Sequence, residues 1–166
     1  MKSCPTAILL VLISLTSCGQ RSYSDREVKA LFLGPWKTST SFESTSPDTH
    51  IRIRSQGRAT FKDDGTVVFE TDTLMTITVP EGELPVSYRA VVYGGWWIDG
   101  QQLRTSRASE KVEPMDALSR RFIESEGMKK LRSKGSTNFV FTLKHLSPRK
   151  IVTLDASGSR TTYRRE

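Results

Sequence analysis

The stretch RATFKDDGTVVFE, residues 58–70, decides the fold class of this chain. Apolar and polar side chains alternate through it, and this period of two is typical of half-buried β-strands. Asp64-Gly65 separates the two apolar runs, and glycine readily adopts the positive φ that a tight turn between strands requires. The stretch therefore predicts a β-hairpin.

The period of two continues on both sides of this hairpin. Gly94-Gly95 interrupts one of the later runs and would permit a bulge or a bend there. An antiparallel meander removes its exposed edges most readily by closing into a barrel. We therefore expect a mainly β fold, a meander of about eight strands closed into a small barrel. The other runs lie at residues 51–54, 74–79, 87–93, 101–105, 138–143, 150–154 and 160–164.

One segment departs from this pattern. Pro114 suits the first turn of a helix, and Met115, Leu118 and Phe122 recur at spacings of three and four residues. We therefore predict one helix near residues 114–132.

Residues 1–17 have the three-part layout of a secretory signal, with a basic start, an apolar run and small residues at the end. The apolar run is well under the roughly 18 to 20 residues that a membrane-spanning helix needs. The sequence Leu15-Thr16-Ser17-Cys18, where this segment ends, resembles the lipobox of bacterial lipoproteins. The resemblance implies that a peptidase removes residues 1–17 and that Cys18 carries acyl chains, such as palmitate, that anchor the protein to the membrane.

The lipobox resemblance also divides the rest of the chain. Residues 18–26 are polar and would form the lipidated N-terminus and a flexible spacer, and residues 27–166 would form a single β-rich domain. Cys4 lies in the segment to be removed, so the mature chain would hold no disulfide. Gly19 stands where an Asp would resemble an inner-membrane retention signal. We therefore expect a location in the bacterial cell envelope, at the outer membrane.

Two further motifs resemble the small lipocalin-like domains of many bacterial lipoproteins. One is Gly34-Pro35-Trp36-Lys37, which has the Gly-x-Trp spacing of the first lipocalin strand, and the other is the late Thr161-Thr162-Tyr163-Arg164. The resemblance implies that Trp36 packs across the closed end of a barrel with Arg164 over its ring as a cation–π plug. The chain departs from secreted lipocalins because its helix precedes the last strands, and their second and third motifs are not evident.

A barrel of about eight strands is just wide enough for packed side chains or for one small ligand. The side chains that could line an apolar pocket are Met75, Ile77, Tyr88, Trp96 and Phe141. We favour the other interpretation, that they fill a solid core, because any small sheet requires aromatic and β-branched residues at a period of two. Trp96 and Trp97 must point to opposite faces of a regular strand, so one of the two rings is either exposed or covered by the helix. An exposed tryptophan is a suitable contact for a partner or a glycan.

The formal net charge of +7 is compatible with an anionic lipid, polysaccharide or nucleic acid. The basic residues are scattered through the chain, however, so we expect a solvated surface and no nucleic-acid partner. His50 and His145 are isolated, and no pattern resembles a nucleophile elbow, a zinc helix or a phosphate loop. We expect no enzyme, no metal site and no cofactor.

Two classes of function remain. The first is a membrane-anchored lipoprotein that carries a small hydrophobic ligand in a lipocalin-like barrel. The second is a structural or assembly lipoprotein, like the small pilot lipoproteins, that binds another envelope protein or a glycan through its surface. A hollow barrel would favour the first class, and a filled core with an exposed aromatic and basic surface would favour the second.

Overall fold

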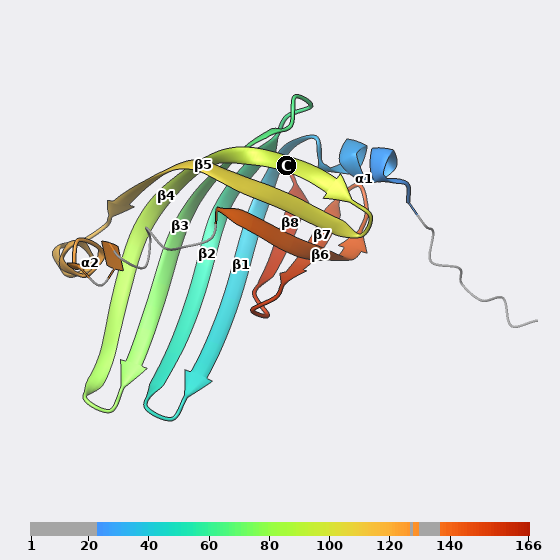
Figure 1. The fold of residues 1–166 in the computed structure, drawn as a ribbon. Helices are drawn as coiled ribbons and strands as arrows, with labels where there is room; N and C mark the ends of the chain where they lie inside the picture. Colours follow the sequence, from blue (N-terminus) through green and yellow to red (C-terminus); the bar gives the residue numbers. More distant parts are fainter. Residues whose placement is uncertain (1–22, 127, 130–136) are drawn as a thin grey trace, which may run out of the picture.

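The computed structural model describes residues 23–126, 128–129 and 137–166. Within them, eight antiparallel strands follow one another in chain order, and the last strand pairs with the first to close a barrel (Figure 1). The mainly β fold predicted as a closed meander of about eight strands is confirmed. The expected signal peptide at 1–17 and the lipid attachment at Cys18 lie outside the described residues. The strands are β1 (Gly34–Ser46), β2 (Thr49–Phe61), β3 (Thr66–Val79), β4 (Gly82–Asp99), β5 (Gln102–Pro114), β6 (Asn138–Leu146), β7 (Lys150–Asp155) and β8 (Arg160–Arg165).

The strands of the first half are longer than the separate runs in the sequence predicted. Residues 51–54 and 58–61 belong to one strand, β2, which pairs with β3 along nearly its whole length. β8 pairs with β1 only from Trp36 to Ser41, so β1–β4 continue past β6–β8 as a curved sheet (Figure 1). The β4–β5 register shifts between Tyr93 and Gly94, which confirms the irregularity expected at Gly94-Gly95.

The helix α1 (Asp25–Phe32) was not predicted. It begins with a capping box, because Ser24 accepts the backbone N–H of Glu27 while the Glu27 carboxylate accepts the backbone N–H of Ser24. Val28 and Phe32 of this helix are buried. Asp25 and Arg26, the last two residues of the range 18–26 expected to form a flexible spacer, are helical.

The helix α2 (Ala117–Ile123) is shorter than the helix predicted near 114–132. Pro114 does not open it but ends β5, where β6 no longer pairs with that strand among the described residues. An edge position of this kind tolerates the missing N–H of proline. Two members of the predicted apolar stripe, Met115 and Leu118, are exposed. Residues 127 and 130–132 of the predicted span lie outside the described residues.

The hydrophobic core fills one end of the barrel, beneath α1. The rings of Phe61 and Trp96 meet edge to face with their centroids 5.1 Å apart, and Phe32 of α1 packs on Phe61 at 5.0 Å. Ala59, Val67, Leu103, Ile151 and Tyr163 complete much of this cluster. This end of the barrel is therefore solid.

No helix among the described residues is long and apolar enough to cross a membrane.

Asp116 caps α2 and joins it to β4. Its carboxylate accepts the backbone N–H and the hydroxyl of Ser119, and also the hydroxyl of Ser87, each at 2.7 Å. These hydrogen bonds, first the one from the Ser119 backbone, lower the pKa of Asp116 from 3.8 to about 2. Because the folded pKa lies below the unfolded one, this stabilisation is present above about pH 4 and is lost as the pH falls toward 2.

We expect Asp116→Ala to lower the melting temperature by roughly 2 to 6 °C at pH 7, because α2 loses its N-cap. The difference in melting temperature between the wild type and the variant should shrink as the pH falls from 4 to 2, where the wild-type carboxylate becomes protonated. Thermal unfolding followed by circular dichroism at several pH values measures this difference. A difference that stays constant down to pH 2 would contradict the assignment.

Candidate functional site

Trp36 and Arg165 close one end of the barrel. Trp36 is fully buried, and its Nε1–H donates to the Phe32 carbonyl at 2.7 Å. The Arg165 guanidinium lies over the indole, 4.0 Å from the ring centroid. It also donates to the carbonyls of Leu33 and Leu31 at 2.7 and 2.9 Å. Arg165 therefore joins the last strand to the C-terminal end of α1.

The plug expected from Trp36 and Arg164 was wrong in its second member. The β1–β8 register places Arg165 opposite Trp36, whereas Arg164 is opposite Lys37. Successive side chains of a strand point to opposite faces, so Arg164 is exposed on the outside of the barrel. The prediction was wrong by one position in the sequence, and it therefore named an arginine on the outer face of the strand.

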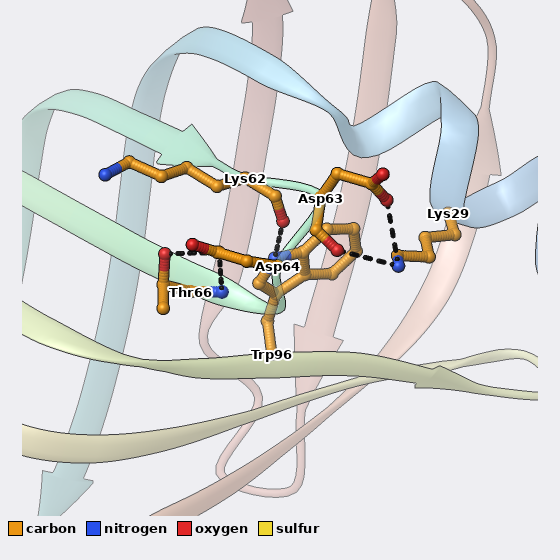
Figure 2. A network of polar contacts seen from close by, with 6 residues as sticks. All are labelled: Lys29, Lys62, Asp63, Asp64, Thr66 and Trp96. Atoms are coloured by element: carbon orange, nitrogen blue, oxygen red, sulfur yellow. Dashed lines mark hydrogen bonds and ion pairs between the residues drawn. The ribbon is translucent and has the colours of Figure 1, made fainter.

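The β2–β3 turn is held against this closed end from two sides (Figure 2). Lys29 of α1 contacts the carboxylate and the carbonyl of Asp63, both at 3.0 Å. Trp96 of β4 donates its Nε1–H to a carbonyl of the turn at 2.9 Å. Asp64 accepts the hydroxyl and the backbone N–H of Thr66 at 2.7 and 2.8 Å, which lowers the pKa of Asp64. These two aspartates stabilise the turn.

A cavity of about 280 Å³ lies inside the barrel, next to the solid end. Its wall includes the apolar side chains Phe69, Val92, Phe139 and Phe141. Five threonines share the wall, and the hydroxyls of Thr40 and Thr161 bond to each other at 2.9 Å. The cavity can therefore hold an apolar group and can also bind a polar one. The threonines are Thr38, Thr40, Thr71, Thr105 and Thr161.

A bulge turns two charged side chains of β5 toward this cavity. Arg107 is opposite Gly94 and Glu110 is opposite Val92, whereas a regular strand would place residues three apart on opposite faces. The extra residue of the bulge removes this conflict. The pair is joined by a 3.1 Å contact from Nη1 to Oε2, with the side chains only 20% and 23% exposed. The Arg107 guanidinium also lies 6.0 Å from the centroid of the Phe139 ring.

Sequence reasoning missed this ion pair. Gly94-Gly95 indicated the irregularity in the β4–β5 pairing, but the inward turn of Arg107 and Glu110 depends on which β5 residues lie opposite these glycines. The sequence gives only a weak indication of the threonines that line the cavity, because they recur at alternate positions of a strand, such as Thr38 and Thr40.

The residues expected to line a pocket or fill a core are divided between regions of the barrel. Trp96 belongs to the solid core, and Phe141 lines the cavity. Met75, Ile77 and Tyr88 are half-buried on the part of β3 and β4 beyond the cavity and do not line it. The barrel is therefore filled at the α1 end and hollow in its middle.

Trp96 and Trp97 lie on opposite faces of β4, as the strand alternation predicted. Trp96 is 3% exposed, whereas Trp97 is 45% exposed and Tyr93 is 50% exposed. Arg104 of β5 is the cross-strand neighbour of Trp97. The outer side of β4 therefore presents two exposed aromatic rings, and a basic residue lies beside the Trp97 ring.

The two histidines lie apart from the cavity. His50 contacts the carboxylate of Glu43 on the outer surface at 2.6 Å, and His145 is exposed on β6. Among the residues that the structure describes, no three His, Cys, Asp or Glu side chains lie close enough to hold a metal ion.

Comparison with solved structures finds two proteins whose folds are similar to that of this chain. One is a lipocalin-like protein from Bacteroides uniformis, 8% identical, which covers 82% of this chain and 99% of its own with a TM-score of 0.40. The other is an uncharacterized protein from Bacteroides eggerthii, 11% identical, which covers 81% of this chain and 99% of its own with a TM-score of 0.41. No protein-family model and no curated protein gives a significant match.

Proposed function

We propose that this chain is a lipid-anchored lipoprotein of the bacterial envelope whose barrel binds a small, mainly hydrophobic ligand. The observation that carries the proposal is the cavity of about 280 Å³ between the solid end and the open part of the barrel. Ligand pockets commonly measure roughly 300 to 1,000 Å³, so this cavity suits one small ligand.

The cavity wall also indicates which kind of small ligand would fit. The rings of Phe69, Phe139 and Phe141 supply apolar contact area. The threonine hydroxyls and the Arg107–Glu110 pair supply donors and acceptors on the same wall. A ligand with a short apolar body and one polar group matches this distribution best.

The lipid anchor is proposed from the lipobox at Leu15-Thr16-Ser17-Cys18. Ser24, which caps α1, follows Cys18 by only six positions, a reach of at most about 20 Å. An anchor at Cys18 would therefore hold the closed, α1-covered end of the barrel near the outer membrane. Mass spectrometry of the protein from bacterial membranes tests this, because lipidation adds the acyl mass at Cys18 and Cys18→Ala prevents it.

The ligand is tested with native mass spectrometry of the chain from Gln20 onward, produced in bacteria. All described helices and strands, and the whole core, lie between Asp25 and Arg165, so this chain keeps the complete described fold. We expect extra mass above the polypeptide that is lost on denaturation. Thr71→Trp, which fills the cavity, should abolish it.

The matched control is Thr76→Trp, five positions along the same strand, whose side chain points to the other face and is absent from the cavity wall. The control should retain the ligand. A wild-type chain that carries no extra mass and takes up no added fatty acid would refute the ligand-binding proposal.

A second function is favoured by one observation, the exposed rings of Tyr93 and Trp97 on one face of β4, with Arg104 opposite Trp97. Exposed aromatic residues next to arginine are common centres of protein interfaces. The alternative is therefore a structural or assembly lipoprotein that binds another envelope protein or a glycan through this surface. Crosslinking in bacterial envelopes from a photoreactive residue at position 97 would identify such a partner. An absence of crosslinks in cells that contain the folded protein would exclude it.

A further inference from the structure

Four basic side chains stand in one row across four strands on the outside of the barrel. Lys150 of β7 is opposite Arg164 of β8, Arg164 is opposite Lys37 of β1, and Lys37 is opposite Arg58 of β2. All four are exposed. Directly opposite side chains have Cβ atoms about 4.5 to 5.5 Å apart, and like charges at that spacing destabilise a sheet.

Acidic side chains compensate only one end of this row. Arg58 forms an ion pair with Glu166, with Nη2 and Oε1 2.9 Å apart. Among the described residues, Lys37, Lys150 and Arg164 form no ion pair. The positive charge of the row is therefore largely unneutralised. Repulsion among these side chains destabilises the folded state and does not stabilise it.

The row borders a broad hollow of about 840 Å³ on the outer surface. Next to the row, its floor holds Ser39, Gln56 and Thr162, which are side by side in the β8–β1–β2 register and can donate hydrogen bonds. Beyond them, Arg160 and Arg54 flank Ser41 in a second basic row. We call this surface the basic face, defined by Lys37, Arg54, Arg58, Lys150, Arg160 and Arg164.

Within the hollow, the basic row and the acidic side chains lie on different sides. The opposite wall of the hollow, on β3, carries Glu70 and Asp72, and Asp72 is paired with Arg89 at 2.8 Å. An anion would therefore bind on the β7–β8–β1–β2 side.

The first row of the basic face lies near the end of the barrel that α1 covers. Arg165, next to Arg164 in the chain, donates to two carbonyls of the α1 region. The start of α1 follows the proposed anchor at Cys18 by a few residues. A tether at that end would hold the basic face within reach of the membrane surface.

We propose that the basic face docks on the anionic phosphate headgroups of the membrane. The inference rests on the proposed location in the bacterial envelope. It depends neither on the acyl chains of the lipid anchor nor on the ligand cavity. A basic patch adds a second, reversible attachment to a lipid anchor. Docking would fix the orientation of the barrel on the membrane, with β7–β8–β1–β2 toward the lipid and the exposed Trp97 of β4 directed elsewhere.

The test uses the unlipidated chain from Gln20 onward and sedimentation with phosphatidylcholine vesicles, with or without one third phosphatidylglycerol. We expect binding to the anionic vesicles only, and weaker binding as salt is added. The double variant Lys37→Gln/Arg164→Gln should bind roughly tenfold to thirtyfold more weakly. It should unfold at the same urea concentration as the wild type or a higher one, because a repulsive contact is removed.

The matched control is Lys111→Gln/Arg120→Gln, which removes the same net charge from β5 and α2, outside the basic face. This control should keep most of the vesicle binding. Equal weakening by both double variants would show a nonspecific charge effect and overturn the proposal. Competition by millimolar inorganic phosphate as effective as that by anionic vesicles would also overturn it, because it would show a site for free phosphate. Neither outcome bears on the ligand test, which is read from the cavity.

Discussion

Replacing Gly57 by alanine is expected to destabilise the barrel by about 3 to 5 kcal/mol. A Cβ atom at this position would overlap the carbonyl oxygen of Glu70 and lie 2.7 Å from the Cα of Thr71. Both are backbone atoms of β3, so no rotation of a side chain can relieve the overlap. The strands β2 and β3 would have to separate and lose hydrogen bonds at the centre of the sheet. Urea unfolding of the two proteins measures the difference in free energy.

The same variant should also disturb the cavity. Gly57 lies in register between Thr38 of β1 and Thr71 of β3, and both threonines line the cavity. Gly100→Ala is the control, because a Cβ there has no atom within 4 Å and only the positive φ of 57° opposes it. That control should lose about 1 kcal/mol. A Gly57→Ala protein that is no less stable than the control would show that β2 and β3 do not approach so closely.

Replacing Trp96 by alanine is expected to lower the free energy of unfolding by about 3 to 5 kcal/mol. The ring contacts Phe61 at 5.1 Å and Phe32 at 6.0 Å between centroids, so its removal leaves a cavity beneath α1. The Lys62 carbonyl would also lose the hydrogen bond that it accepts from Nε1–H. Urea unfolding again measures the loss, and the fluorescence of the remaining tryptophans can follow it.

Trp97→Ala is the matched control for this prediction, since it removes the same side chain from the next position of the same strand. Trp97 is 45% exposed, so its loss should change the free energy of unfolding by less than about 1 kcal/mol. Similar losses for both variants would contradict the assignment of Trp96 to the core and Trp97 to the surface. If the outer surface of β4 binds a partner, Trp97→Ala should weaken that contact without affecting the fold.

Local patterns in the sequence were sufficient for the strands and for several of their details. The hairpin at Asp64-Gly65, the irregularity at Gly94-Gly95 and the opposite faces of Trp96 and Trp97 were all predicted correctly. Each of these depends on the geometry of a few consecutive residues, such as the two-residue repeat of a strand.

The helices and the plug were predicted less well, for different physical reasons. The capping-box residues Ser24 and Glu27 are visible in the sequence, but a helix of eight residues is marginal by itself and here gains stability by burying Val28 and Phe32 in the barrel. The plug prediction chose Arg164 in place of Arg165 because the motif does not specify the β1–β8 register, in which one step reverses the face.

The sequence by itself determined that the chain forms antiparallel strands, that they are joined by tight turns and that the fold is mainly β. Only the tertiary structure decided where the barrel is hollow, which charges enter the cavity and which basic residues form one surface. Arg107 and Glu110 turn inward together because of their pairing with β4, and Lys37 meets Lys150 across Arg164 although they are far apart in the sequence. Such neighbours arise from the register between distant strands, which the composition and period of a single strand do not specify.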